Sequence, residues 1–173
     1  LEHMAFKGTK RRDAQAIATE VENVGGLMNA HTSREETAYY LRLLPEHIDL
    51  GIDILNDILT QSTLPDVEIE RERGVIIQEI GQSLDTPDDL VFDLFARACY
   101  DNHNLGRPIL GTVDSVSSFL RADLNGFMKR FYGARQMLVV ASGAVRHDNI
   151  VARIGTSLGS LPDAQMAERV PPL

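Results

Sequence analysis

Tryptophan is absent from this chain, cysteine occurs once, and aromatic residues make up only 6% of its 173 residues. A single cysteine cannot form an internal disulfide, which excludes a disulfide-stabilised secreted scaffold. Cys99 lies in an apolar helical pattern, so we expect it to be a small, buried hydrophobic residue. With so few aromatic residues, the core has to be built from leucine, isoleucine, valine and alanine.

Long apolar runs and an excess of positive charge are also missing. No apolar segment is long enough to cross a bilayer, so we expect no membrane span. The formal net charge of −8 argues against a nucleic-acid partner, because such surfaces depend on neutralising phosphates. Apolar residues at 43% and charged residues at 24% are typical of a globular domain, and the length allows one sizeable core.

The order of helical and strand-like patterns predicts an α+β fold, with helices packed on a mostly antiparallel sheet. Gly25-Gly26 is expected to end the first helix, and the polar turn Ser33-Arg34-Glu35 is expected to join two strands. Periodicity predicts helices over 14–24, 48–59, 66–84, 87–98 and 122–132 and from 148 onward, strands over 27–32, 37–43 and 137–141, and a loop over 101–111.

Glutamate and histidine residues with a suggestive spacing are the candidates for chemistry. Glu2 and His3 stand together, and Glu79 follows His3 by 76 positions. Glu72 and Glu79 are seven apart, close to two helical turns, so they share one face of the predicted helix. A terminal Glu-His pair alone carries little information, and a solvated helix face also explains paired glutamates. The surrounding segments decide between these interpretations.

Four segments in order resemble motifs of the pitrilysin/insulinase family of zinc peptidases, and most closely its processing-peptidase branch. In that inverzincin family, a glutamate directly precedes the second histidine of an H-x-x-E-H metal motif. The resemblance extends from Leu1 to about Pro162. The segments are LEHMAFKGT at 1–9, GGLMNAHTSREETAY at 25–39, ERGVIIQE at 72–79 and HNLGRPILG at 103–111.

The resemblance implies a zinc site. It assigns His3 as the second motif histidine, Glu79 as a further metal ligand, Glu2 as the general base and Glu72 as a supporting catalytic carboxylate. Two histidines four apart on a helix can reach one ion, and a catalytic zinc takes three protein ligands. The first motif histidine falls two positions before Leu1. We therefore expect the chain to begin within the motif and to be a poor enzyme by itself.

The segment around Asn29 and Ala30 resembles the family's strand along the substrate cleft. It implies that these two residues contact an extended peptide or unfolded polypeptide, which would add to the strand by main-chain hydrogen bonds. An ordinary core hairpin is the alternative. For His31 we expect a solvent-facing or packed side chain. For His103, in the fourth motif, we expect a structural position in a loop.

Residues 1–173 thus resemble most of the N-terminal, catalytic half of a two-half clamshell peptidase. The preceding strands and the homologous second half, in the same chain or in a partner subunit, are expected to lie outside it. The implied function is a zinc-dependent metalloendopeptidase that uses Zn²⁺-activated water. The alternative is a non-catalytic partner or core subunit that binds peptides or assembles with an active subunit. One cysteine and the acidic charge fit the bacterial cytoplasm, with the mitochondrial matrix or periplasm as alternatives.

Overall fold

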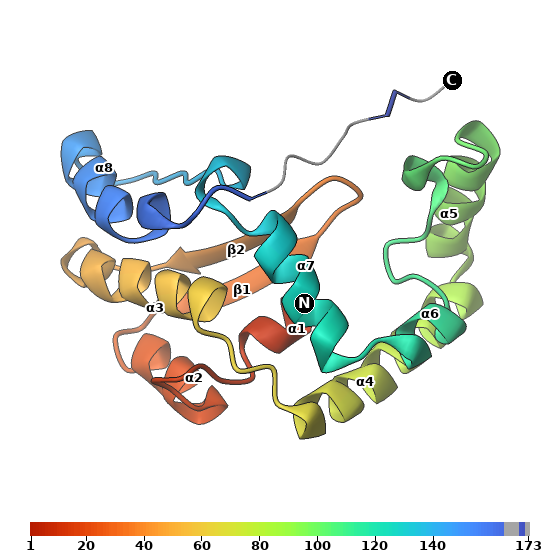
Figure 1. Cartoon of the computed structure of the whole chain (residues 1–173), viewed down its shortest axis with the longest axis horizontal. Helices are drawn as coiled ribbons and strands as arrows, with labels where there is room; N and C mark the ends of the chain where they lie inside the picture. The colour runs from red at the N-terminus through yellow and green to blue at the C-terminus, as the bar shows by residue number, and fades with distance from the viewer. Residues whose placement is uncertain (165–169, 172–173) are drawn as a thin grey trace.

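The computed structural model describes residues 1–164 and 170–171, and it confirms the α+β prediction (Figure 1). In the described residues the sheet has two strands only. Short 3-10 turns lie at Pro45–His47, Asn104–Gly106, Ala134–Gln136 and Leu158–Ser160. The helices and strands are α1 (Glu2–Ala5), α2 (Ala14–Glu22), β1 (Leu27–Thr32), β2 (Thr37–Arg42), α3 (Ile48–Thr60), α4 (Asp66–Asp85), α5 (Pro87–Cys99), α6 (Val113–Ser118), α7 (Arg121–Phe131) and α8 (His147–Thr156).

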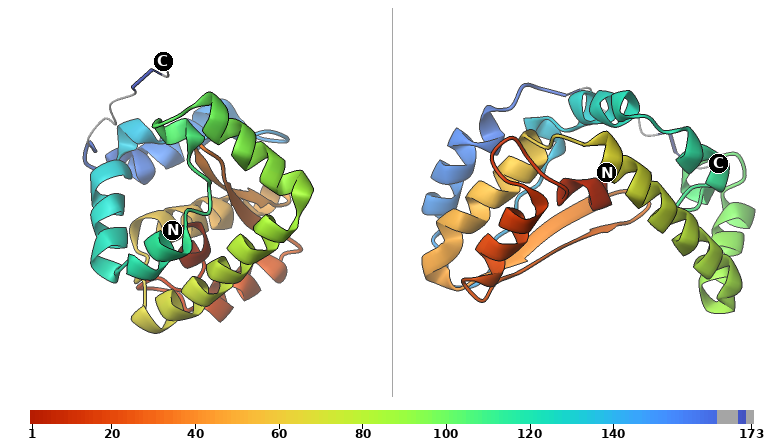
Figure 2. Two further views of the ribbon diagram at one scale, coloured as in Figure 1. Left: turned by 90° about the vertical axis from the view of Figure 1, so that its right-hand side faces the viewer. Right: turned by 90° about the horizontal axis from the view of Figure 1, so that it is seen from below.

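The hairpin of β1 and β2 forms where the sequence predicts it. The strands are antiparallel, with Leu27 opposite Arg42 and Thr32 opposite Thr37. Gly25 has a φ of 68°, a left-handed conformation that ends α2 at little cost because glycine has no Cβ. The helices α1, α2 and α3 lie on one side of the hairpin, where they cover it (Figure 2, right).

Two apolar clusters hold α1 in place. In the first, Ala5 packs with fully buried residues of α2 and α3, among them Ile17 and Ile54. In the second, Met4 packs with Leu64 and with Ile69 of α4. Consecutive residues of α1 therefore enter different clusters, which fixes this short helix between the hairpin and α4.

A partly buried ion-pair network ties the segment after α1 to α2 and α3. The Arg12 guanidinium bonds Asp57 at 2.8 Å, Asp53 at 2.7 Å and Glu20 at 2.9 Å. Asp57 is 0% exposed and also accepts a hydrogen bond from the Thr9 hydroxyl at 2.8 Å. Because a buried charge is costly without partners, this network holds the chain close to α3.

The helices α4, α5 and α6 form an arm that extends away from the hairpin, whereas α7 and α8 lie back beside α1 and α3 (Figure 1). Many apolar side chains of this arm are exposed. The prediction that Cys99 is buried is wrong, because it ends α5 on a face that stays exposed. Arg34 in the hairpin turn bonds Asp93 of α5 at 2.8 Å and the Leu105 carbonyl at 2.9 Å. This contact joins the tip of the hairpin to the arm. The large exposed side chains of α5 are Val91, Phe92, Leu94 and Phe95.

The segment 137–141 was predicted to be a buried strand, and this prediction is wrong. Residues 137–140 have no regular structure, and Leu138 and Val140 are 88% and 78% exposed. A strand needs a neighbour for its ladder of hydrogen bonds, and within residues 1–164 none pairs with this segment. Among the described residues, no helix is both long and apolar enough for a bilayer crossing.

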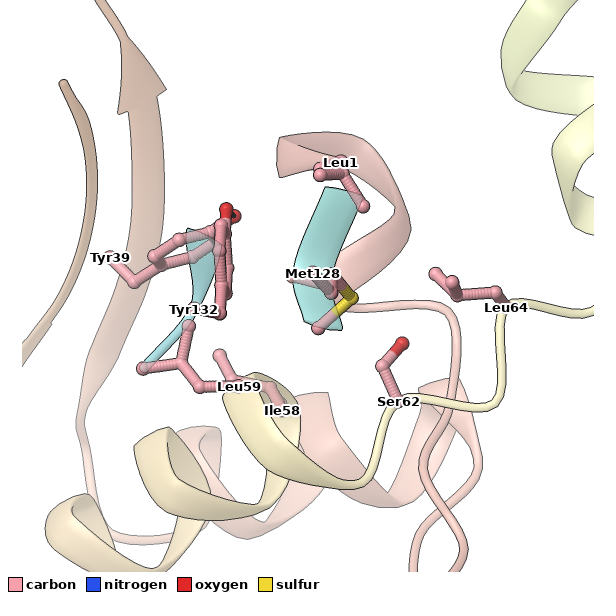
Figure 3. A pocket seen from close by; sticks show the side chains of 9 residues that line it. Leu1, Tyr39, Ile58, Leu59, Ser62, Leu64, Met128 and Tyr132 are labelled. Carbon is pink, nitrogen blue, oxygen red and sulfur yellow. Dashed lines mark hydrogen bonds between the residues drawn. The ribbon is translucent and has the colours of Figure 1, made fainter. Parts of the chain in front are cut away.

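A small apolar pocket lies between α1, β2, α3 and α7 (Figure 3). The Tyr39 and Tyr132 hydroxyls meet there at 3.1 Å, and burial raises the pKa of both phenols. The cavity measures about 10 Å³, roughly the space of one water molecule. It is therefore a gap in the packing of the core and no place for a substrate.

Candidate metal centre

His3 lies between the two glutamates that the spacing placed on one face of α4. Its Nδ1 is 2.8 Å from Glu72 Oε2, and its Nε2 is 3.8 Å from Glu79 Oε2. The two glutamates are two helical turns apart, so each faces a different edge of the imidazole ring. The structure thus brings together three of the predicted site residues, although His3 is far from the two glutamates in the sequence.

Glu72 is 9% exposed and makes two charged contacts. Its Oε2 faces His3, and its Oε1 is 2.6 Å from Lys7 Nζ. Burial raises the pKa of the Glu72 carboxyl, but hydrogen bonds from Lys7 and His3 outweigh burial and leave this pKa below its usual value. The ionised carboxylate can only accept, so His3 Nδ1 donates. In the neutral imidazole, this leaves the Nε2 lone pair directed toward Glu79.

The donor atoms of His3 and Glu79 fit a zinc ion. Zinc binds histidine nitrogen and carboxylate oxygen at about 2.0–2.2 Å, so atoms 3.8 Å apart can both reach one ion. The Glu72 contact to Nδ1 is the support that metal-binding histidines commonly have. No cluster of three or more metal-binding side chains forms a complete site within residues 1–164 and 170–171. The described chain therefore offers two candidate ligands, His3 and Glu79, with Glu72 in contact with the first.

Glu2, the predicted general base, is held by the hairpin. Its Oε2 accepts a hydrogen bond of 2.5 Å from the Thr32 hydroxyl at the end of β1. Thr32 in turn lies 3.4 Å, hydroxyl to hydroxyl, from its cross-strand partner Thr37. This contact places the carboxylate of Glu2 where α1 meets the strand that resembles the family's substrate strand.

Asn29 and Ala30 lie in β1, as expected, but they face different surroundings. Asn29 is exposed, whereas Ala30 is 7% exposed and packs in the core. The Ala30 amide donates to Asn29 Oδ1 at 2.8 Å. In the described residues β1 pairs with β2 alone, so its other edge has no neighbouring strand. The assignment of these two residues to peptide binding remains a prediction.

Lys7 and Thr32 make two polar contacts in the site that the sequence patterns did not predict. Each lies within one of the four motifs, and this position in a motif was the signal that could have identified it. Their partners, Glu72 and Glu2, come from other segments, and only packing brings them together.

His31 is exposed, and His103 accepts a hydrogen bond from the Leu105 amide at 3.1 Å. His103 therefore has the structural position expected of it.

Comparison with known sequences identifies the family of the chain. The profile of the insulinase family, peptidase family M16, matches residues 1–113. A zinc protease of Rickettsia felis is 40% identical over 171 residues, which cover 99% of this chain and 42% of the relative. The mitochondrial-processing peptidase subunit beta of Saccharomyces cerevisiae is 42% identical, over 95% of this chain and 36% of its own. The chain thus spans about two fifths of the length of these relatives.

Solved structures show the same fold over essentially the whole chain. An inactive peptidase M16 domain from Pseudomonas fluorescens superposes with a TM-score of 0.89 at 18% identity, covering 99% of this chain and 42% of that one. A putative M16-like peptidase from Alicyclobacillus acidocaldarius gives 0.80 at 28% identity, covering 100% and 38%. At 18% identity the first likeness is evidence of fold alone. From the profile match and the 40% identical relatives, the chain belongs to the insulinase family, peptidase family M16.

Proposed function

We propose that this chain is the metal-binding part of a zinc-dependent metalloendopeptidase that cleaves extended peptides or unfolded polypeptides. The observation that carries the proposal is the setting of His3, which is held by Glu72 with its Nε2 toward Glu79. Membership in the family and the names of the relatives, a zinc protease and a processing peptidase, support it. A non-catalytic partner or core subunit would have no chemical need for this set of side chains.

His3 and Glu79 would be two of the metal ligands. We propose that a histidine two positions before Leu1, four before His3, completes the set of three in the complete protein. When bound, zinc supplies a Lewis acid that lowers the pKa of water and polarises the scissile carbonyl. The chain of 173 residues, with two of the three ligands, is expected to bind zinc weakly.

Glu2 would act as the general base. The Thr32 hydroxyl engages Oε2, which leaves Oε1 as the oxygen that takes the proton from the attacking water. The same carboxylic acid then returns this proton to the leaving amine, so Glu2 is regenerated in each cycle. Glu72 takes no proton in this scheme. It keeps His3 oriented, with Lys7 compensating its charge.

The peptide would bind along the open edge of β1, beside Asn29 and Ala30. Main-chain hydrogen bonds to a strand edge are tolerant of side-chain sequence, which suits a peptidase for extended segments. Asn29 Oδ1 now accepts the Ala30 N–H, where a peptide carbonyl could accept instead. A bound peptide that used this amide would have to displace the Asn29 side chain.

A homologous second half or a partner subunit would close the cleft over the peptide. Relatives such as the yeast processing peptidase, of which this chain covers 36%, leave ample length for such a half.

The bacterial cytoplasm is the compartment we favour, with the mitochondrial matrix or periplasm as alternatives. The acidic composition and single cysteine fit each of them.

The test uses the complete protein and measures two quantities, its zinc content and its rate of cleavage of a quenched fluorescent peptide. Glu2→Gln should keep one zinc per chain and lower kcat by about 10²- to 10⁴-fold. Glu79→Gln should lose zinc and activity together, whereas Glu70→Gln should change neither, because Glu70 is an exposed residue of the same helix paired with Arg73. A complete protein that neither binds zinc nor cleaves peptides would be the non-catalytic subunit instead.

A further inference from the structure

We propose that Thr32 is a positioning residue for Glu2: its hydroxyl sets the orientation of the carboxylate that serves as the base. This inference rests on the proposed function, because it gives Glu2 that role. It concerns a residue of the hairpin that lies outside the metal ligands and their support. The contact itself is a hydrogen bond of 2.5 Å from Thr32 Oγ1 to Glu2 Oε2.

The length of this bond is typical of a hydroxyl that donates to an ionised carboxylate. A threonine hydroxyl has one proton, and that of Thr32 is directed to Glu2. Thr37, directly opposite in the hairpin, can then donate its own proton to Thr32 across the 3.4 Å that separate the two oxygens. The two threonines form a short chain of donors that ends on the base.

Glu2 needs such a partner, because its own helix does little to orient its side chain. The helix α1 has four residues and no side-chain cap at its N-terminus. Burial of Met4 and Ala5 fixes the backbone, but a glutamate side chain still has several rotatable bonds. Thr32 is the opposite case. It is β-branched, stiff about χ1, and lies at the end of a six-pair antiparallel ladder.

The consequence is a geometric link between peptide and base. The strand proposed to receive the peptide also carries the hydroxyl that holds Glu2. Any shift of β1 would move both together, which would keep the base at a constant distance from the scissile bond. Lys7, Glu72 and His3 form a separate set of contacts. Loss of the Thr32 hydroxyl should therefore disturb Glu2 without disturbing zinc.

Thr32→Val and Thr32→Ser in the complete protein test the inference. Valine keeps the shape and β-branching and removes the hydroxyl, whereas serine keeps the hydroxyl. Thr32→Val should lower kcat by about 10- to 100-fold through misplacement of the base, with KM within about twofold and zinc content unchanged. Thr32→Ser should restore most of kcat. Thr37→Val, which removes only the second donor, should cost less than Thr32→Val.

Crystal structures of the wild type and of Thr32→Val provide a second measurement that needs no activity. In the variant, the Glu2 carboxylate should leave its place or occupy several rotamers. A carboxylate that stays in place, or an unchanged kcat, would overturn the inference. So would a loss of zinc or of thermal stability that accounts for the lower kcat. Failure of the proposed function gives a different result, namely a wild-type protein without peptidase activity or a fully active Glu2→Gln.

Discussion

The N-terminal unit, residues 1–60, buries most of its large apolar side chains, whereas the helical arm of α4, α5 and α6, residues 66–118, leaves many of its own exposed. Ile17, Ile54 and Ile58 of the first region are at most 1% exposed. On the arm, Phe92 and Phe95 are 71% and 65% exposed. Both regions contain amphipathic helices. The difference is that the first has a hairpin and neighbouring helices on which to pack, and the arm has few such neighbours within residues 1–164.

The candidate metal centre lies where these two regions meet. Glu2 and His3 come from the N-terminal unit, and Glu72 and Glu79 come from the first helix of the arm. Contiguous exposed apolar surface on a folded protein is typical of a face covered by another surface. The exposed face of α5 agrees with the proposal that a second half or partner subunit completes the protein. Four predictions test how far the two regions differ.

The largest effect is expected from the ion pair between Arg12 and the fully buried Asp57 in the N-terminal unit. Arg12→Met would leave the fully buried Asp57 without its cation, which should lower the free energy of unfolding by about 3–5 kcal/mol. Arg71→Met, on the exposed surface of the arm, should change it by less than about 1 kcal/mol, since exposed ion pairs contribute little. Urea denaturation of both variants measures the contrast, and equal losses would contradict it.

Truncation of apolar side chains should show the same contrast. Ile54→Ala removes atoms from the centre of the core and should destabilise the chain by about 2–5 kcal/mol. Phe92→Ala removes a larger but exposed side chain, and the effect should stay within about 0.5 kcal/mol. If Phe92→Ala proved as costly as Ile54→Ala in urea, α5 would be packed in solution and the comparison would fail.

The joint between the two regions should contribute less. Arg34→Met removes the contacts from the hairpin turn to Asp93 and to the Leu105 carbonyl, at a cost of about 1 kcal/mol. Amide hydrogen exchange should then become faster in α5 and remain unchanged in α2 and α3. Arg71→Met is the matched control and should leave exchange in α5 unaltered. Faster exchange throughout the chain would mean that the regions unfold together.

The smallest effect on the free energy of unfolding is expected when the pH is lowered. The hydrogen bond from Arg11 has the largest effect on the pKa of Asp53 and lowers it; burial opposes this, and the hydrogen bond from Arg12 and the charges of both arginines bring the pKa to about 2. A pKa below the unfolded value means that the stabilisation is present above about pH 4 and is lost as the pH falls toward 2. Asp53 is 39% exposed, so water screens the interaction and keeps the effect modest. Asp53→Asn should make the free energy of unfolding less dependent on pH in this range. An unchanged dependence on pH would contradict this prediction.

Local patterns predicted much of the fold. Gly25-Gly26 ends α2, the turn at 33–36 joins the strands, and the apolar spacing places α3, α4 and α5 within a few residues of their bounds. The same patterns failed at Cys99 and at 137–141. Apolar character shows that a segment favours burial, but it does not show whether a neighbour exists to bury it. In the described chain, neither segment has enough neighbours.

For the candidate site, the sequence by itself determined which residues share a helix face. Glu72 and Glu79 are two turns apart in any α-helix, and the order of the four motifs identifies Glu2 and His3. Only the tertiary structure decided what each side chain contacts: Glu72 bridges Lys7 and His3, and Thr32 holds Glu2. These contacts join segments far apart in the chain. They depend on α1 being fixed between two apolar clusters, which spacing along the sequence cannot specify.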